Sequence, residues 1–268
     1  MATMLIIAVT GCKKDNDNDI IPNAPPLPPL SSLVMDFSEF DNPDDTIPGR
    51  DLSSYTNWGR SYVLVSAWNM AVTAVVAIPF ASYAVALSQT PVYIPGTGAW
   101  VWAYDFTANS VVYSAELTGY YDGADSVAWE MRISQTGGYT DFLWYHGKMH
   151  IANNEIDYVN WIILDNPVNN NPFLKIDWTY FNNVGNESTS TTYTNINSAS
   201  PGYHDFINFA VFVTDNFREF LVFDASEGII TDIEYYVDTR EGRIKDPVFF
   251  LDEEWHCWDT NLMNVVCP

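Results

Sequence analysis

Carboxylates are the most abundant side chains in this sequence that could do chemistry. Asp and Glu together number 34, against four His and three Cys. Glycoside hydrolysis needs two carboxylates facing each other across a cleft, and the sequence does not show which acids face one another. An acidic chain carries many solvated carboxylates on its surface, so we assign no catalytic pair. The acids considered are Asp44, Asp45, Glu116, Glu130, Glu155, Glu253 and Glu254.

Other signatures of catalysis or metal binding are missing from the sequence. Neither a Gly-x-Ser-x-Gly nucleophile turn nor a Gly-rich phosphate loop opening a helix occurs. His146 and His150 have a spacing that would share one face of a helix, but the residues around them favour a strand. His256 and Cys257 are adjacent, and neighbouring residues seldom bind one ion together. We therefore predict no catalytic residue, no metal site and no cofactor.

The beginning of the chain carries the strongest motif. A short apolar run, too short to span a bilayer as a helix, leads to Val9-Thr10-Gly11-Cys12. Small residues directly before a cysteine resemble the lipobox of bacterial lipoproteins, which implies a signal peptide over residues 1–11 and a lipid-modified Cys12 that anchors the protein in a membrane. No Lys or Arg precedes Cys12, so we expect the true translation start to lie upstream of Met1. The alternative interpretation is an ordinary cysteine.

The residues after Cys12 predict a tether over 12–30. Two lysines and then alternating Asp and Asn over 13–19 are similar to the tether of surface-exposed lipoproteins of the Bacteroidota, which implies a place on the outer face of the outer membrane. A plain solvated linker is the alternative, and a calcium loop is disfavoured because the glycine and distal glutamate of an EF-hand are missing. The prolines up to Leu30 predict an extended spacer, followed by a single folded domain over 31–268.

The lipoprotein resemblance also bears on the remaining cysteines. If Cys12 carries lipid, Cys257 and Cys267 are left, and the oxidising environment outside the cytoplasm would let them form a disulfide. Closing so short a loop should stabilise the fold by about 2–3 kcal/mol.

Composition limits the class of partner. The chain is 47% hydrophobic and 15% aromatic, enough for a sizeable core, and its net charge is −23. Nucleic acid is excluded as a partner because phosphate binding needs clustered Lys and Arg. The same charge disfavours a broad electrostatic contact with anionic lipid headgroups.

Residues 61–89 predict one long apolar helix. No charged residue occurs from Ser61 to Tyr104, and alanines recur at three- and four-residue steps, the spacing of neighbours on a helix surface. Pro79 should kink this helix because its ring clashes with the preceding turn. A surface helix would carry a charged stripe, so we expect most of its circumference to be buried in the fold. A transmembrane span is the alternative.

The rest of the chain predicts a mainly β fold. Short runs rich in β-branched and aromatic residues alternate with Gly, Asn and Asp turns, as in a sequential antiparallel meander. We expect a strongly curved sheet or a barrel, around or against the helix, similar in architecture to the half-barrel lipid carriers and lipocalin-like barrels of bacterial envelopes. The predicted strands are 100–106, 110–120, 126–135, 141–148, 156–164, 173–181, 188–196, 205–214, 218–224 and 229–238.

Three hypotheses for function follow. The first is a non-enzymatic binding or structural component of the envelope that holds a hydrophobic ligand. The second is a surface glycan-binding accessory protein, since tryptophans stack on apolar faces of ligands as well as filling cores. The third is a glycan hydrolase. The tryptophans predicted to line a ligand site are Trp100, Trp144 and Trp161.

Overall fold

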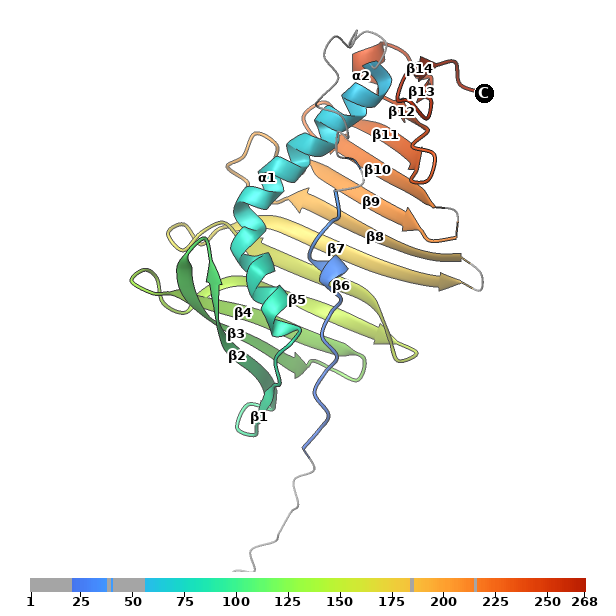
Figure 1. The fold of residues 1–268 in the computed structure, drawn as a ribbon. Helices are drawn as coiled ribbons and strands as arrows, with labels where there is room; N and C mark the ends of the chain where they lie inside the picture. The colour runs from blue at the N-terminus through green and yellow to red at the C-terminus, as the bar shows by residue number, and fades with distance from the viewer. Residues whose placement is uncertain (1–20, 38–39, 41–55, 184–185, 215) are drawn as a thin grey trace, which may run out of the picture.

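The computed structural model describes residues 21–37, 40, 56–183, 186–214 and 216–268. They form a mainly β fold in which one 14-stranded sheet follows chain order from β1 to β14, each strand antiparallel to the next (Figure 1). The predicted antiparallel meander is therefore confirmed. The strands are β1 (Val92–Ile94), β2 (Ala99–Ala108), β3 (Val111–Tyr121), β4 (Ser126–Gln135), β5 (Phe142–Ala152), β6 (Glu155–Leu164), β7 (Pro172–Asn183), β8 (Asn186–Asn195), β9 (Phe206–Phe212), β10 (Phe217–Asp224), β11 (Ile229–Tyr236), β12 (Gly242–Lys245), β13 (His256–Trp258) and β14 (Asn264–Val265).

Tight turns explain why each strand pairs with its neighbour in sequence. Asn109 and Ser110, between β2 and β3, have φ of 51° and 64°, and Asn153 and Asn154, between β5 and β6, have φ of 54° and 66°. Two successive residues with positive φ form the hairpin turn that matches the twist of the flanking strands, and Asn tolerates this conformation well.

The sheet has one apolar face and one polar face, as the alternation predicted. On β7, Leu174, Ile176 and Trp178 are buried at 1%, 0% and 4% exposure, whereas Lys175 and Asp177 lie on the opposite face and form an ion pair with each other at 2.8 Å. Most buried residues of the long strands belong to a single core cluster, which also includes buried residues of α1 such as Val65, Val72 and Val76.

Glycines lie opposite tryptophans on the apolar face of the sheet. Gly119 on β3 lies directly opposite Trp129 on β4, and a Cβ added at Gly119 would come within 2.5 Å of the indole ring. Gly147 on β5 lies opposite Trp161 on β6 in the same way. At each position the glycine leaves the space that the indole ring of the opposite residue fills.

The sheet does not close into a barrel, so the barrel alternative is wrong. Among the described residues, β1 pairs only with β2 and β14 only with β13. The helix α1 (Thr56–Ala86) and the chain's N-terminal part lie across the concave face (Figure 1). They cover the apolar surface that closure into a barrel would otherwise have to bury. The two edge strands are short, so few backbone N–H and C=O groups are left without a neighbouring strand.

The helix differs from the prediction of one long apolar helix over 61–89 in its bounds and in its division into two arms, although a kink at Pro79 was expected. α1 is bent by 69° between the arms Thr56–Thr73 and Val75–Ala86. The bend lies one turn before Pro79, where the proline ring meets the carbonyl of Val75 and provides no N–H for it.

The burial of α1 is also less complete than predicted. Its inward side chains Val65, Val72 and Val76 are at most 3% exposed, but Val63 and Met70 are 56% and 69% exposed. The cause is the open sheet, which packs against one side of the helix. Within the described residues no single helix is long and apolar enough to cross a membrane; the two arms of α1 would qualify only together, across their bend.

The N-terminal segment, residues 21–37, is part of the fold and runs beside α1 across the strands (Figure 1). The hydroxyl of Tyr193 on β8 donates to the carbonyl of Leu33 at 3.0 Å and accepts from the backbone N–H of Met35 at 2.6 Å. The hydroxyl of Tyr83 on α1 donates to the carbonyl of Pro28 at 2.6 Å. Pro28 is buried, so the proline-rich stretch predicted as a spacer packs against the body at this point.

Candidate functional site

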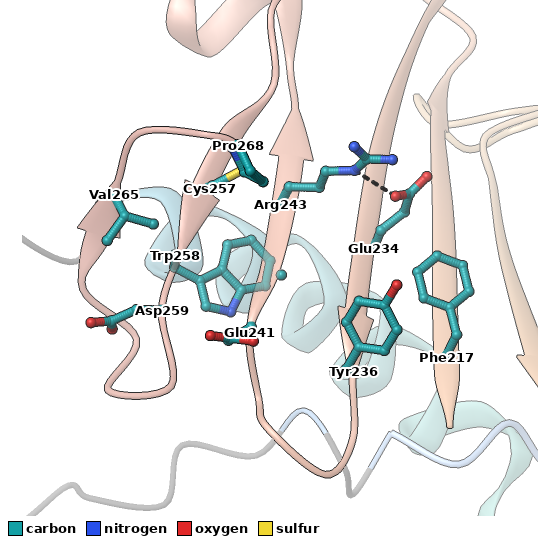
Figure 2. Close-up of a pocket in the computed structure, with 11 residues that line it drawn as sticks. Phe217, Glu234, Tyr236, Glu241, Arg243, Cys257, Trp258, Asp259, Val265 and Pro268 are labelled. Atoms are coloured by element: carbon teal, nitrogen blue, oxygen red, sulfur yellow. Dashed lines mark hydrogen bonds and ion pairs between the residues drawn. The ribbon is translucent and has the colours of Figure 1, made fainter. Parts of the chain in front are cut away.

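A hollow of about 360 Å³ opens at the C-terminal corner of the sheet (Figure 2). It is built by the ends of β10 and β11, by β12, and by the two short strands β13 and β14 that the sequence did not predict. Its walls combine aromatic rings with carboxylates. The lining residues are Phe217, Glu234, Tyr236, Glu241, Gly242, Arg243, Cys257, Trp258, Asp259, Val265 and Pro268.

Aromatic rings form the apolar part of this corner hollow. Phe217 and Tyr236 lie on adjacent strands with ring centroids 5.3 Å apart and planes at 55°. Trp258 is opposite Gly242 in the ladder, the third glycine–tryptophan pair of the sheet. Its Nε1 donates to the carbonyl of Arg240 at 2.8 Å, so this indole is held in place and is nearly fully buried, whereas Tyr236 is 48% exposed.

The polar part of the hollow is mostly acidic. The guanidinium of Arg243 donates to Glu234 at 2.6 Å and lies over the ring of Trp255, 4.2 Å from its centroid. One carboxyl oxygen of Asp259 accepts the backbone N–H groups of Asn261 and Met263, both at 2.9 Å. Because Arg243 is paired with Glu234, its positive charge is balanced and the other carboxylates leave the hollow acidic.

Further carboxylates continue from the hollow along the polar face. Glu219 on β10 lies directly opposite Glu234 on β11. Burial and the neighbouring charges of Glu234 and Asp232 raise the pKa of Glu219. Burial likewise raises the pKa of Asp232, partly offset by Lys245 on the next strand. This part of the sheet therefore concentrates negative charge that is only partly solvated.

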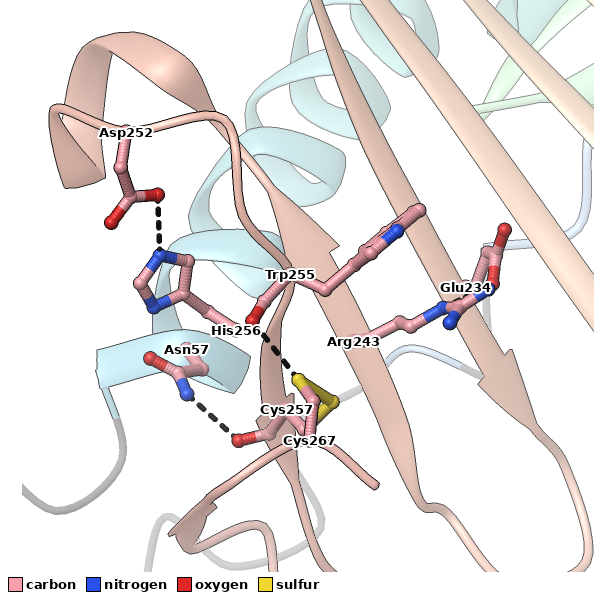
Figure 3. The surroundings of a disulfide bond; sticks show 8 residues. All are labelled: Asn57, Glu234, Arg243, Asp252, Trp255, His256, Cys257 and Cys267. Atoms are coloured by element: carbon pink, nitrogen blue, oxygen red, sulfur yellow. Dashed lines mark hydrogen bonds and ion pairs between the residues drawn. A yellow bond between two sulfur atoms is a disulfide. The ribbon is translucent and has the colours of Figure 1, made fainter.

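The predicted disulfide is confirmed and borders the hollow (Figure 3). The sulfur atoms of Cys257 and Cys267 lie 2.11 Å apart, which ties the C-terminal residues to β13. The carbonyl of Cys257 also accepts from the side-chain amide of Asn57 at 2.7 Å, so the first turn of α1 is held to the same strand.

Two smaller hollows lie between α1 and the sheet. They measure about 260 and 300 Å³ and share Ala67, Trp68 and Asp205 among their lining residues. Leu64, Val72 and Leu174 add apolar surface to one or the other. At the rim, Arg60 donates to Asp246 at 2.7 Å, a carboxylate that is 1% exposed. We call the two hollows together the helix groove.

The structure does not bring the three predicted ligand-binding tryptophans together. Trp161 is fully buried beneath Tyr83 and Tyr145. Trp144 is 7% exposed and its Nε1 donates to the hydroxyl of Tyr139 at 3.1 Å. Trp100 is half-buried beside Tyr93, with ring centroids 5.3 Å apart. They belong to three separate aromatic groups, and the fully buried ring of Trp161 offers no face for a sugar.

The other predicted residues are spread over the molecule. Cys12, Asp44 and Asp45 lie outside the described residues. His146 and His150 lie on β5, a strand as expected, and His150 contacts Asp157 at 2.7 Å. In the parts of the chain that the structure describes, no group of three or more His, Cys, Asp or Glu side chains is arranged to hold a metal ion.

None of the acids weighed for hydrolysis that the structure describes lines the corner hollow. Glu116 lies in a polar hollow of about 410 Å³ over β2–β4 together with Asp105, Asp141 and Arg132, and Arg132 is paired with Asp141 at 3.2 Å and with Glu130 at 3.6 Å. Glu253 is paired with Lys245 at 3.7 Å near the far end of the sheet.

The corner hollow was missed at the sequence level because it depends on the last strands. In the sequence, this hollow was marked only by the run Trp255-His256-Cys257-Trp258 and the cysteine pair. Phe217 and Tyr236 come to line it only because of the strand order. Its aromatic rings, carboxylates and single guanidinium suit a ligand with an apolar face and hydrogen-bonding groups. Its lining includes no Ser, Thr or His.

No protein-family model, curated protein or solved structure matches this chain. Its function is therefore argued from the sequence and the geometry.

Proposed function

We propose that this protein is a cell-envelope lipoprotein, anchored through an acylated Cys12 at the outer membrane and exposed at the cell surface, where it acts as a non-enzymatic binding or structural component. The small residues before Cys12 and the acidic residues after it support the anchor. The Cys257–Cys267 pair at disulfide distance fits an oxidising compartment.

One observation carries the binding or structural role. The concave face, where a carrier of this architecture would enclose its ligand, is occupied by α1 and the N-terminal segment, whose Leu33 is fully buried there. The hollows that remain lie at the corner, between α1 and the sheet, and on the polar face. Ligands and partners are thus met at the surface of the body and beside α1.

The anchor is tested on the full-length chain produced in a bacterium that exports lipoproteins. Mass spectrometry of the purified protein should find acyl chains on the peptide that begins at Cys12, and intact cells treated with protease should lose the protein. The Cys12→Ala variant serves as the control and should be recovered without acyl chains. Unmodified Cys12 in protein made from the full-length gene would overturn the anchor.

A hydrophobic ligand is supported by the helix groove. Its walls include Leu64, Ala67, Trp68 and Val72, and the two hollows that share residues together reach the volume range of small-molecule sites. Native mass spectrometry with lipid extraction, on protein from its own envelope, should detect a bound apolar molecule. The Ala67→Trp variant should lose it, while Ala77→Trp, at another exposed alanine of α1 that lines neither hollow, should retain it. An equal yield of ligand from both variants would remove the groove as its site.

Glycan binding is the second candidate, and the corner hollow favours it. Phe217 and Tyr236 present ring faces beside the carboxylates of Glu234 and Glu241, a combination that can stack on a sugar and accept its hydroxyl protons. A glycan array should show binding that is lost in Tyr236→Ala and kept in Tyr203→Ala, a tyrosine of similar exposure, 41% against 48%. Binding that survives Tyr236→Ala would refute this location.

A further inference from the structure

The edge of the sheet at β1 includes an uncharged segment. The charged residues beside it are Asp122 and Asp125 in the next hairpin loop, and Asp122 is paired with Lys148 at 2.6 Å. Residues 87–100, which contain the end of the chain leaving α1, the strand β1 and its hairpin turn, include no Asp, Glu, Lys or Arg. We call them the uncharged tip. Leu87, Val92 and Ile94 are exposed there at 42%, 63% and 39%. In a chain with a net charge of −23, such a surface is where close approach to anionic lipid costs least.

Aromatic side chains lie on the core-facing side of the same hairpin, opposite to Val92 and Ile94. Tyr93 on β1 and Trp100 on β2 are cross-strand partners with their rings in contact. The Nε1 of Trp100 is buried and its ring packs against the core, so this pair holds the hairpin to the body and leaves Val92 and Ile94 as the outward apolar side chains.

The N-terminal segment leaves the body at this end. In Figure 1 its first residues extend beyond the sheet on the side of β1 and of the last turn of α1. Its exit is fixed, because Pro28 is buried and its carbonyl accepts from the hydroxyl of Tyr83, itself fully buried. Only residues 13–20 separate Cys12 from Ile21, and a chain of that length reaches about 30 Å at full extension. An anchor at Cys12 therefore keeps the uncharged tip close to the membrane.

The opposite end of the molecule is less suited to a lipid surface. Val248 and Leu251 are exposed there at 53% and 87%, but Asp252, Glu253 and Glu254 follow directly. Carboxylates at that position would be repelled by anionic headgroups and would resist transfer out of water.

From these observations we propose that the uncharged tip docks on the surface of the membrane in which Cys12 is anchored, with Val92 and Ile94 at the level of the headgroups, so that the corner hollow faces away from the membrane. This inference rests on the proposed lipid anchor. It adds the orientation of the body, which the anchor alone does not determine.

The orientation is measured on the full-length acylated protein in vesicles of phosphatidylethanolamine and phosphatidylglycerol. A fluorescent label on Ile94→Cys should be quenched by lipids that carry a spin label near the headgroup. The same label on Val248→Cys at the opposite end should not be quenched. Equal quenching at both positions, or quenching at Val248→Cys alone, would overturn the proposed docking while the acyl chains found by mass spectrometry would still support the anchor. Absence of acyl chains on Cys12 would overturn both proposals.

A charge variant gives a second test that does not depend on labels. Val92→Glu should raise the rate at which the acylated protein transfers between vesicles on the order of tenfold, because one apolar side chain no longer leaves water. Val168→Glu is the matched control, since Val168 is 90% exposed in the β6–β7 loop, and its transfer rate should be unchanged. Thermal unfolding of both variants checks that the fold is intact. Equal transfer rates for the two folded variants would refute docking through Val92.

Discussion

The glycine–tryptophan pairs predict a graded response to adding a single methyl group. At Gly119 the three atoms nearest to a new Cβ all belong to the ring of Trp129, the closest at 2.5 Å, and this indole is 1% exposed in a packed core. Overpacking of this kind costs about 1–3 kcal/mol, partly offset by about 0.5–1 kcal/mol from the lower entropy of an unfolded chain with Ala. Gly119→Ala should therefore lower the free energy of unfolding by about 1–2 kcal/mol.

The same change at Gly147 should be more severe. There the nearest obstacle is the backbone carbonyl oxygen of Asn160, followed by the ring of Trp161 at 2.5 Å. A carbonyl in a strand ladder cannot rotate away as a side chain can, so relief requires strands β5 and β6 to separate locally. We expect Gly147→Ala to lower the free energy of unfolding by about 3 kcal/mol or more, at the upper end of overpacking effects.

Denaturant unfolding, followed by tryptophan fluorescence, measures both changes against two controls. Gly59→Ala, within α1 and with nothing within 4 Å of the new Cβ, should raise the free energy of unfolding by about 0.5–1 kcal/mol. Adding Trp129→Leu to Gly119→Ala should cost less than the sum of the single changes, because the ring that obstructs the methyl group is gone. The reasoning fails if Gly147→Ala is as stable as Gly119→Ala, or if the double variant shows no coupling.

Three further changes test other parts of the fold. Cys257→Ser together with Cys267→Ser should lower the free energy of unfolding by about 2–3 kcal/mol. A reducing agent should lower the free energy of unfolding of the original chain by the same amount. Unequal losses would show that the disulfide does not stabilise the fold simply by closing this loop. Tyr193→Phe removes both hydrogen bonds to the N-terminal segment and leaves the N–H of Met35 without this partner. We expect the free energy of unfolding to fall by about 2–3 kcal/mol and proteolysis within residues 21–37 to become faster. A segment that stays resistant to protease would contradict its docking through this hydroxyl. The raised pKa of Glu219 means that the native state binds this proton more tightly than the unfolded chain does, so the ionised carboxylate lowers the free energy of unfolding above that pKa. Glu219→Gln should therefore stabilise the protein at pH 7, and the gain should disappear as the pH falls to the ordinary pKa of a glutamate. A gain that persists at pH 3 would refute this cause.

Most of the sheet could be predicted from the sequence because its signals are local. On β7 the alternation of Leu174, Ile176 and Trp178 with polar residues identifies the strand and its buried face, and the turn residues identify the hairpins. All ten predicted strands correspond to β2–β11. The other four strands, β1, β12, β13 and β14, are two to four residues long, too short to show a period.

Closure of the sheet and the place of the helix could not be predicted in the same way. Whether β1 meets β14 depends on how far each strand pair turns, and the glycines that admit Trp129 and Trp161 act only through contacts between strands. Pro79 indicated a bend in α1, but the exposure of Val63 and Met70 follows from the open sheet. The corner hollow depends on residues from β10 to β14, so no local pattern joins Phe217 to Trp258.

The order of the strands also determines the order in which the chain can fold. Every strand pairs with its neighbour in sequence, so the sheet can form from any hairpin, with little loop-closure entropy at each step. The N-terminal segment is different, since the bonds of Tyr193 to Leu33 and Met35 join residues about 160 positions apart. The part of the chain that is synthesised first must therefore wait for β8 before it can dock. A chaperone that holds this segment would act on the protein while its concave face is still open.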